Sequence, residues 1–152
     1  MTRYAIGLGS NLGDRIGHLR TAHQGIQGLG EIAGVAGLYE TAPVGGPDQA
    51  PYLNSLVVLE SDLAATDLLV ELNRIEADAG RERTTKWGPR TLDLDIISME
   101  PDSIAEPNLS VPHVRARERE FVLRPLCDVW PEALVGPEIT AAKALDALQP
   151  QG

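Results

Sequence analysis

The sequence has little of what marks secreted and membrane proteins. Cys127 is the only cysteine among 152 residues, so no internal disulfide can form, and a reducing cytoplasm fits best. No apolar run approaches the roughly 20 residues that span a bilayer, and the N-terminal segment lacks the long apolar stretch of a secretory signal. We expect a cytoplasmic protein that does not bind membranes, and we take it to be a monomer.

Positive charge is also scarce. Thirteen Lys and Arg residues face 22 Asp and Glu residues, and the formal net charge of −9 argues against broad nucleic-acid binding. The cations are unevenly spread, because eight of the 13 lie in residues 81–90 and 115–124. A charge run is usually a solvated face. Two basic clusters in an acidic chain, one of them next to a carboxylate pair, favour a compact anionic ligand instead.

Aromatic residues make up 4% of the chain, so each position is informative. Tyr39 lies in a predicted strand and is expected in the core. Tyr52, Trp87 and Phe121 instead stand at the ends of elements, beside polar loops. Core packing is the ordinary interpretation of each one alone, but together they could stack on a flat heterocycle. Asn54, two positions after Tyr52, would face the same side and could read the edge of such a ring.

The order of elements predicts one α+β domain over residues 1–152. Periodicity and turn residues predict strands at 3–9, 33–42, 52–61 and 91–97, with helices from the turn at 10–14 to about 29 and over 65–79. This β-α-β-β-α-β order is that of a ferredoxin-like sandwich, here with C-terminal additions. In those additions, residues 107–120 are predicted as a loop with a short helical piece, 121–130 as a buried apolar segment, and 140–148 as a helix.

The glycine-rich segment "GLGSNLG" at 7–13 follows a strand and opens a helix. This superficially suggests a dinucleotide-binding turn. The expected second and third strands follow each other without a crossover helix, which suits a hairpin rather than a doubly wound sheet. A tight turn with a helix cap is the better interpretation. There is also no GxxxxGK[ST] motif.

The segment "KWGPRTLDLDII" at 86–97 carries the strongest chemical signal. On a strand, Asp93 and Asp95 point to one face, and their apolar neighbours point to the other. Two like charges about 7 Å apart repel each other and are costly to bury unpaired. They could be paired with nearby arginines, or they could bind Mg²⁺, whose shell is usually completed by phosphates. Two metals held close together could grip a phosphoryl group during its transfer.

The remaining charged residues fit phosphate chemistry, which needs positioning and charge neutralisation more than covalent help. Arg81, Arg83 and Arg90 lie in a loop bounded by Gly and Pro, which could close over a ligand and exclude water. Guanidinium groups pair with phosphate oxygens in a bidentate manner. His113, before the second basic cluster, could donate to a phosphate, or it could simply bond to backbone groups in its loop.

Four segments together resemble a known family. "GLGSNLGDR" (7–15), "YETAPVGGPDQAPYLN" (39–54), "RIEADAGRERTTKWGPRTLDLDII" (74–97) and "LSVPHVRAREREFVLRPL" (109–126) are similar to the 6-hydroxymethyl-7,8-dihydropterin pyrophosphokinases of folate biosynthesis. The resemblance implies a ferredoxin-like fold. It also implies transfer of a pyrophosphoryl group from MgATP to the pterin's hydroxymethyl oxygen, with release of AMP.

The resemblance assigns roles to individual residues. Two Mg²⁺ ions would bind Asp93 and Asp95, and transfer would be assisted by Arg81 and Arg90. The pterin would be bound by Thr41, Val44, Tyr52, Asn54, Trp87 and Phe121, with the two rings of Tyr52 and Phe121 sandwiching it and Trp87 on the moving loop. ATP would be bound by Glu76, Arg83, Lys86, Ile96, Ser110, His113 and Arg119.

Two other classes compete with the enzyme hypothesis. A non-catalytic ferredoxin-like module that binds a nucleotide or a pterin is the first, because fold alone does not fix function. It leaves the paired aspartates and clustered cations without a role. A metal-dependent nuclease or nucleotidyl transferase acting on polymers is the second, and the net charge disfavours it.

Overall fold

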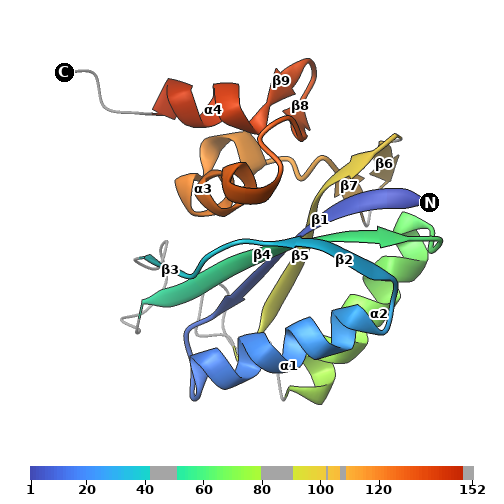
Figure 1. The fold of residues 1–152 in the computed structure, drawn as a ribbon, viewed down its shortest axis with the longest axis vertical. Coiled ribbons are helices and arrows are strands. Elements are labelled where there is room, and N and C mark those ends of the chain that lie inside the picture. Colours follow the sequence, from blue (N-terminus) through green and yellow to red (C-terminus); the bar gives the residue numbers. More distant parts are fainter. Residues whose placement is uncertain (42–50, 80–90, 102, 107–108, 149–152) are drawn as a thin grey trace.

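The computed structural model describes residues 1–41, 51–79, 91–101, 103–106 and 109–148. Figure 1 shows the arrangement of the elements. In chain order they are β1 (Thr2–Ser10), α1 (Arg15–Gln27), β2 (Glu31–Val35), β3 (Tyr39–Thr41), β4 (Tyr52–Ser61), α2 (Ala65–Asp78), β5 (Asp93–Glu100), β6 (Ile104–Glu106), β7 (Leu109–Val111), the 3₁₀-helix η1 (Ala116–Glu118), α3 (Glu120–Val129), β8 (Leu134–Gly136), β9 (Ile139–Thr140) and α4 (Ala141–Leu148).

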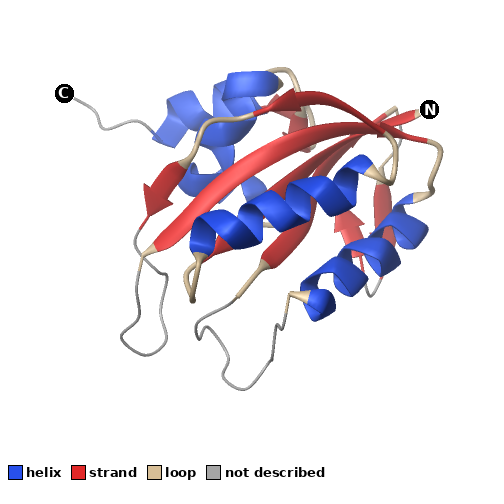
Figure 2. Cartoon of the chain, turned by 60° about the horizontal axis from the view of Figure 1, so that its bottom comes forward, coloured by secondary structure: helices blue, strands red, loops and turns tan. Residues whose placement is uncertain are grey.

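An antiparallel sheet in the order β2-β4-β1-β5 forms the centre of this mixed α/β fold, and β3 pairs with the start of β4. Helices α1 and α2 cover one face of the sheet (Figure 2). Helix α3 covers the other face, and α4 packs on the outer side of α3 (Figure 1). Two small hairpins, β6–β7 and β8–β9, lie outside the main sheet. Among the described residues, no helix combines the length and the apolar character needed to cross a membrane.

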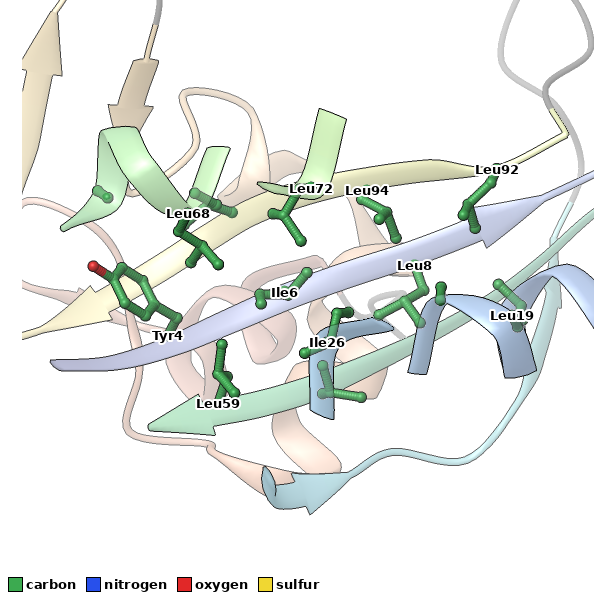
Figure 3. Packing of buried hydrophobic residues seen from close by; sticks show 14 of the residues in the cluster. Tyr4, Ile6, Leu8, Leu19, Ile26, Leu59, Leu68, Leu72, Leu92 and Leu94 are labelled. Carbon is green, nitrogen blue, oxygen red and sulfur yellow. The ribbon is translucent and has the colours of Figure 1, made fainter. Parts of the chain in front are cut away.

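The alternation of side chains along β1 explains the two layers. Tyr4, Ile6 and Leu8 point toward the face that α1 and α2 cover, where they belong to one buried cluster with Leu68 and Leu72 of α2 (Figure 3). Each fully buried side chain of this size contributes about 1.5–3 kcal/mol relative to an exposed one. The intervening positions of β1 hold small residues, which leave the opposite face of the sheet open near the end of the strand.

Most elements up to β5 agree with the sequence pattern. The strand expected at 52–61 is β4 and the helix expected at 65–79 is α2. Helix α1 begins directly after the turn expected at 10–14, and the Asp14 carboxylate caps it by accepting a hydrogen bond of 3.0 Å from the N–H of Gly17.

The strand expected at 33–42 is wrong as a single element. It is two short strands, β2 and β3, which pair with different parts of β4. Between them the N–H of Ala36 bonds to the Leu56 carbonyl, so the chain stays beside β4 while it bends. Tyr39 is correspondingly not a core residue. It is half-buried, and its hydroxyl donates a 2.5 Å hydrogen bond to the Asp128 carboxylate of α3.

The C-terminal third contains more regular structure than expected. Part of the loop predicted at 107–120 is strand β7, which pairs with β6. The apolar segment at 121–130 is helix α3, although it contains Pro125. A proline inside a helix removes one backbone hydrogen bond, but burial of Leu123, Pro125 and Leu126 against the sheet stabilises this helix nonetheless.

Candidate functional site

One pocket lies on the sheet face that α3 covers, near the end of β1. It is lined by residues of β1, β3, β4 and β5, by the segment before η1, and by α3. Eight of the residues singled out from the sequence meet there, namely Thr41, Tyr52, Asn54, Asp93, Asp95, His113, Arg119 and Phe121.

Gly7 and Gly9 form the floor of this pocket, a role that the sequence analysis missed. They lie within β1, not in a turn; the turn follows them and contains Gly13, whose φ is +72°. Gly9 pairs with Asn54 on one side and with Asp93 on the other. A Cβ atom at Gly9 would lie 2.9 Å from Oδ1 of Asn54 and 3.5 Å from the Tyr52 ring. At Gly9 the floor therefore has no room for a side chain unless Asn54 moves.

The wall on the β4 side is polar and ordered. Nδ2 of Asn54 donates a 2.6 Å hydrogen bond to Oγ1 of Thr41 on the neighbouring strand β3. Asn54 is only 8% exposed, so its amide orientation is fixed by this contact. Tyr52 lies one side-chain step along the same face of β4, and Phe121 enters the pocket from α3. The two rings thus come from elements on different sides of the pocket.

The wall on the β5 side carries the two carboxylates. Asp93 and Asp95 are both half-buried and both line the pocket, whereas Leu92, Leu94 and Ile96 are buried in the core on the other face. The predicted alternation is therefore confirmed. Within the described part of the chain, no group of three or more His, Cys, Asp and Glu residues forms a metal site. Two carboxylates are a suitable donor set for Mg²⁺, which takes most of its other ligands from water and phosphates.

His113 occupies the pocket with a defined ring orientation. Its backbone N–H bonds to the Ile97 carbonyl at 2.9 Å, and its Nδ1 atom accepts a 3.2 Å hydrogen bond from the N–H of Arg115. An Nδ1 that accepts leaves the proton of the neutral ring on Nε2. Burial, followed by the positive charge of Arg119, lowers the pKa of His113, and Asp93 opposes this shift. The ring is therefore a neutral donor through Nε2 near pH 7.

Only part of the basic cluster at residues 115–124 reaches the pocket. Arg119 lines it and stands over the Phe121 ring, with 5.5 Å between the guanidinium carbon and the ring centroid. Arg124 instead pairs with Glu120 one turn earlier on the exposed side of α3. For the described cluster at 115–124, proximity along the chain therefore overstates how many cations line the pocket.

Three described candidates lie outside the pocket lining. Ile96 is in the core under α1 and α2, Ser110 is half-buried in β7, and Glu76 is buried in α2. Oε2 of Glu76 accepts a 2.8 Å hydrogen bond from the N–H of Leu94. Six candidates lie outside the described residues: Val44, Arg81, Arg83, Lys86, Trp87 and Arg90.

The pocket combines two carboxylates, a neutral histidine donor, an arginine and two aromatic rings. This combination is typical of an enzyme that binds a small anionic substrate and a heterocycle. Comparison with known proteins identifies the family. The family model for 7,8-dihydro-6-hydroxymethylpterin-pyrophosphokinase matches residues 5–131. The chain belongs to this family.

The sequence aligns with individual relatives over most of their length. The chain is 39% identical over 154 residues to a 2-amino-4-hydroxy-6-hydroxymethyldihydropteridine pyrophosphokinase of Methylorubrum extorquens, covering 100% of this chain and 97% of the relative. It is 42% identical over 142 residues to the enzyme of that name in Bacillus subtilis, covering 91% and 83% respectively.

Solved structures show the same fold at low sequence identity. The wild-type HPPK-DHPS protein of Plasmodium falciparum with SDX-DHP superposes with a TM-score of 0.74 at 16% identity, over 96% of this chain. The chain covers 44% of that protein, less than half of its length. This likeness supports the mixed α/β architecture with its antiparallel sheet.

Proposed function

We propose that the pocket is the active site in which this pyrophosphokinase transfers a pyrophosphoryl group from ATP to 6-hydroxymethyl-7,8-dihydropterin, in folate synthesis. The family and its full-length relatives support the reaction. One observation carries its placement: Asn54 and Asp93 flank the same glycine of β1. A pterin whose ring is bound by Asn54 would hold its hydroxymethyl group near Asp93.

The pterin ring would lie over the glycine floor, between the rings of Tyr52 and Phe121. Asn54, Thr41 and Val44 would bind its polar edge. Trp87 would also contact the pterin. Offset aromatic stacking of this kind favours a flat ring over other ligands of the same size. The proposal explains why no side chain rises from Gly9, because the edge of a ring held between Tyr52 and Phe121 would need the space above this floor.

ATP would extend from the carboxylates toward His113 and Arg119. The neutral ring of His113 donates from Nε2 and Arg119 supplies a permanent positive charge, so both can bind phosphate oxygens. Arg83, Lys86 and Ser110 would bind the same nucleotide. Glu76 and Ile96, which the resemblance also assigns to it, lie in the core on the other side of β5 and would act on the nucleotide site only indirectly. Arg81 and Arg90 would assist the transfer itself.

Asp93 and Asp95 would hold two Mg²⁺ ions, and these ions would neutralise charge on the phosphates during transfer. The hydroxymethyl oxygen forms a bond to the β-phosphorus while the bond from that phosphorus to the oxygen shared with the α-phosphate breaks. AMP leaves with that oxygen, and the hydroxyl proton is released. The chain's part is to orient the two substrates and to keep water from the β-phosphorus.

We further propose that the whole chain is one ferredoxin-like domain, that it acts as a monomer, and that it works in the cytoplasm. The order β-α-β-β-α-β of the main elements supports the fold. A single cysteine suits a reducing compartment.

A nucleotide product assay with purified protein, MgATP and the pterin tests the reaction. We expect one AMP per pterin consumed, and no AMP without the pterin. ADP as the product would mean transfer of a single phosphoryl group. Tight binding of both ligands without turnover would favour the non-catalytic binding module.

A further inference from the structure

Glu76 is a buried carboxylate at a position where the rest of its helix face is apolar. Leu68, Leu72 and Glu76 follow each other at four-residue spacing along α2 and all face the core. The two leucines are 0% exposed and Glu76 is 4% exposed. Burying a carboxylate at a core position is unfavourable unless it is hydrogen-bonded, so the residue type at this position calls for an explanation.

The bonding partner of Glu76 is the peptide between the two aspartates. Its Oε2 atom accepts a 2.8 Å hydrogen bond from the N–H of Leu94. β5 is the last strand of its sheet, and an edge strand leaves alternate N–H groups without a partner strand. Glu76 therefore supplies from α2 an acceptor that a neighbouring strand would otherwise supply.

The hydrogen bond between Glu76 and Leu94 lies at the start of β5. β5 begins at Asp93, so this end of the ladder is held by pairing with β1 on one side only. Asp93 and Asp95 carry like charges on the same strand face, and their repulsion favours twisting the strand away from this arrangement. A bond at the residue between them fixes the peptide on which both side chains depend.

We propose that Glu76 is a positioning residue for catalysis, which orients both carboxylates of β5 through the Leu94 N–H. This inference rests on the proposed function, because it takes Asp93 and Asp95 as the cation-binding pair. Glu76 acts from the far side of the strand, so it assists the reaction without lining the pocket. A misplacement of catalytic groups by about 1 Å can lower a rate by about 100-fold.

Two substitutions separate this role from simple packing. Glu76→Leu continues the apolar face of α2 and removes the acceptor, and replacing a buried charge by an apolar residue often leaves stability unchanged or raised. Glu76→Gln keeps an acceptor oxygen of the same reach. Glu71→Gln is the matched control, because Glu71 lies on the same helix and pairs with Arg74 at the surface.

We expect Glu76→Leu to keep its fold and its pterin affinity, to lower kcat about 10- to 100-fold, and to need more Mg²⁺ for half-maximal rate. In the metal-free protein, its Leu94 amide should exchange with solvent at least about tenfold faster than in the wild type. Glu76→Gln and Glu71→Gln should stay close to the wild type in all these measurements.

Three results would overturn the inference. The first is a Glu76→Leu protein with wild-type kcat and wild-type exchange at Leu94. The second is a Glu76→Gln protein as impaired as Glu76→Leu, which would make the charge and not the acceptor important. The third is a parallel loss of melting temperature, pterin affinity and kcat, which would indicate a structural role alone. Asp95→Asn, assayed beside them, tests the proposed function separately: full turnover in that variant refutes the carboxylate site itself.

Discussion

Asn54 and Asp93 stand on opposite sides of Gly9 in a single cross-strand row of the sheet. Adjacent strands are about 4.8 Å apart, so the two backbones are roughly 10 Å from each other. This spacing places the side chain that we propose binds the heterocycle and the side chain that we propose binds cations at the two ends of one row. On that proposal, one pocket can hold the acceptor and the nucleotide side by side.

Gly9→Ala should selectively weaken pterin binding. The added Cβ would stand 2.9 Å from Oδ1 of Asn54, which must move and strain its bond to Thr41. Disturbing a buried hydrogen bond costs about 1–3 kcal/mol, so we expect the pterin Kd to rise roughly 5- to 150-fold. Fluorescence titration with the pterin measures this change, and titration with MgATP should show little.

Gly37→Ala is the control for that experiment. A Cβ at Gly37 meets its nearest atom, Oδ2 of Asp128, only at 4.0 Å, and the residue lies outside the pocket lining. It should bind the pterin like the wild type. Equal pterin affinity in Gly9→Ala and Gly37→Ala would show that the glycine floor does not support the ring.

Tyr39→Phe should loosen the contact between β3 and α3. The hydrogen bond to the Asp128 carboxylate is the main cause of a raised pKa of Tyr39, and burial of the phenol adds to it. A raised pKa means that the bond stabilises the fold fully below about pH 10 and is lost as the pH rises through the folded-state value. At neutral pH we expect a loss of about 0.5–1 kcal/mol, because this hydrogen bond lies at the exposed surface. Thermal melting should show a decrease of a few degrees, and the difference from the wild type should disappear at high pH.

His113 should titrate below its ordinary pKa of about 6.5 in the metal-free protein. Burial is the main cause and Arg119 adds to it. The unfolded chain then binds a proton at a pH where the folded chain does not, so this residue stabilises the fold above about pH 6.5 and loses that effect as the pH falls toward the folded-state pKa. NMR of the imidazole nitrogens should show the proton on Nε2 near pH 7.

Asp93→Asn provides the check on that assignment. Asp93 raises the pKa of His113, so its removal should lower that pKa further. A His113 pKa above 6.5, or a proton on Nδ1 in the neutral ring, would contradict the ring orientation described for the pocket.

The sequence predicts the parts of the fold that depend on local pattern. Alternation in β5 correctly placed Asp93 and Asp95 on one face, because strand periodicity holds whatever the neighbouring strand is. The spacing of Leu68 and Leu72 likewise predicted α2. Local pattern did not predict helix α3. Pro125 disfavours a helix locally, and the helix is stabilised by packing of its buried side chains against the rest of the protein.

The floor of the pocket could not be predicted in this way. Gly7 and Gly9 fall inside the strand expected at 3–9, but nothing local shows that the absence of side chains there forms the floor of a pocket. Their meaning depends on which residues of β4 and β5 lie beside them, and register is a property of strand pairs. Glu76 is a similar case, because its contact with Leu94 joins α2 to β5 across 18 positions of the chain.

The most direct test of the account is the Asp95→Asn variant, assayed for AMP formation with saturating MgATP and pterin, beside its melting temperature and pterin affinity. We predict that AMP formation falls by at least about 100-fold, since oriented charge stabilisation supplies most of the rate in phosphoryl transfer, while fold and pterin binding stay close to wild type. AMP formation at the wild-type rate would contradict the assignment of the carboxylate pair to the reaction.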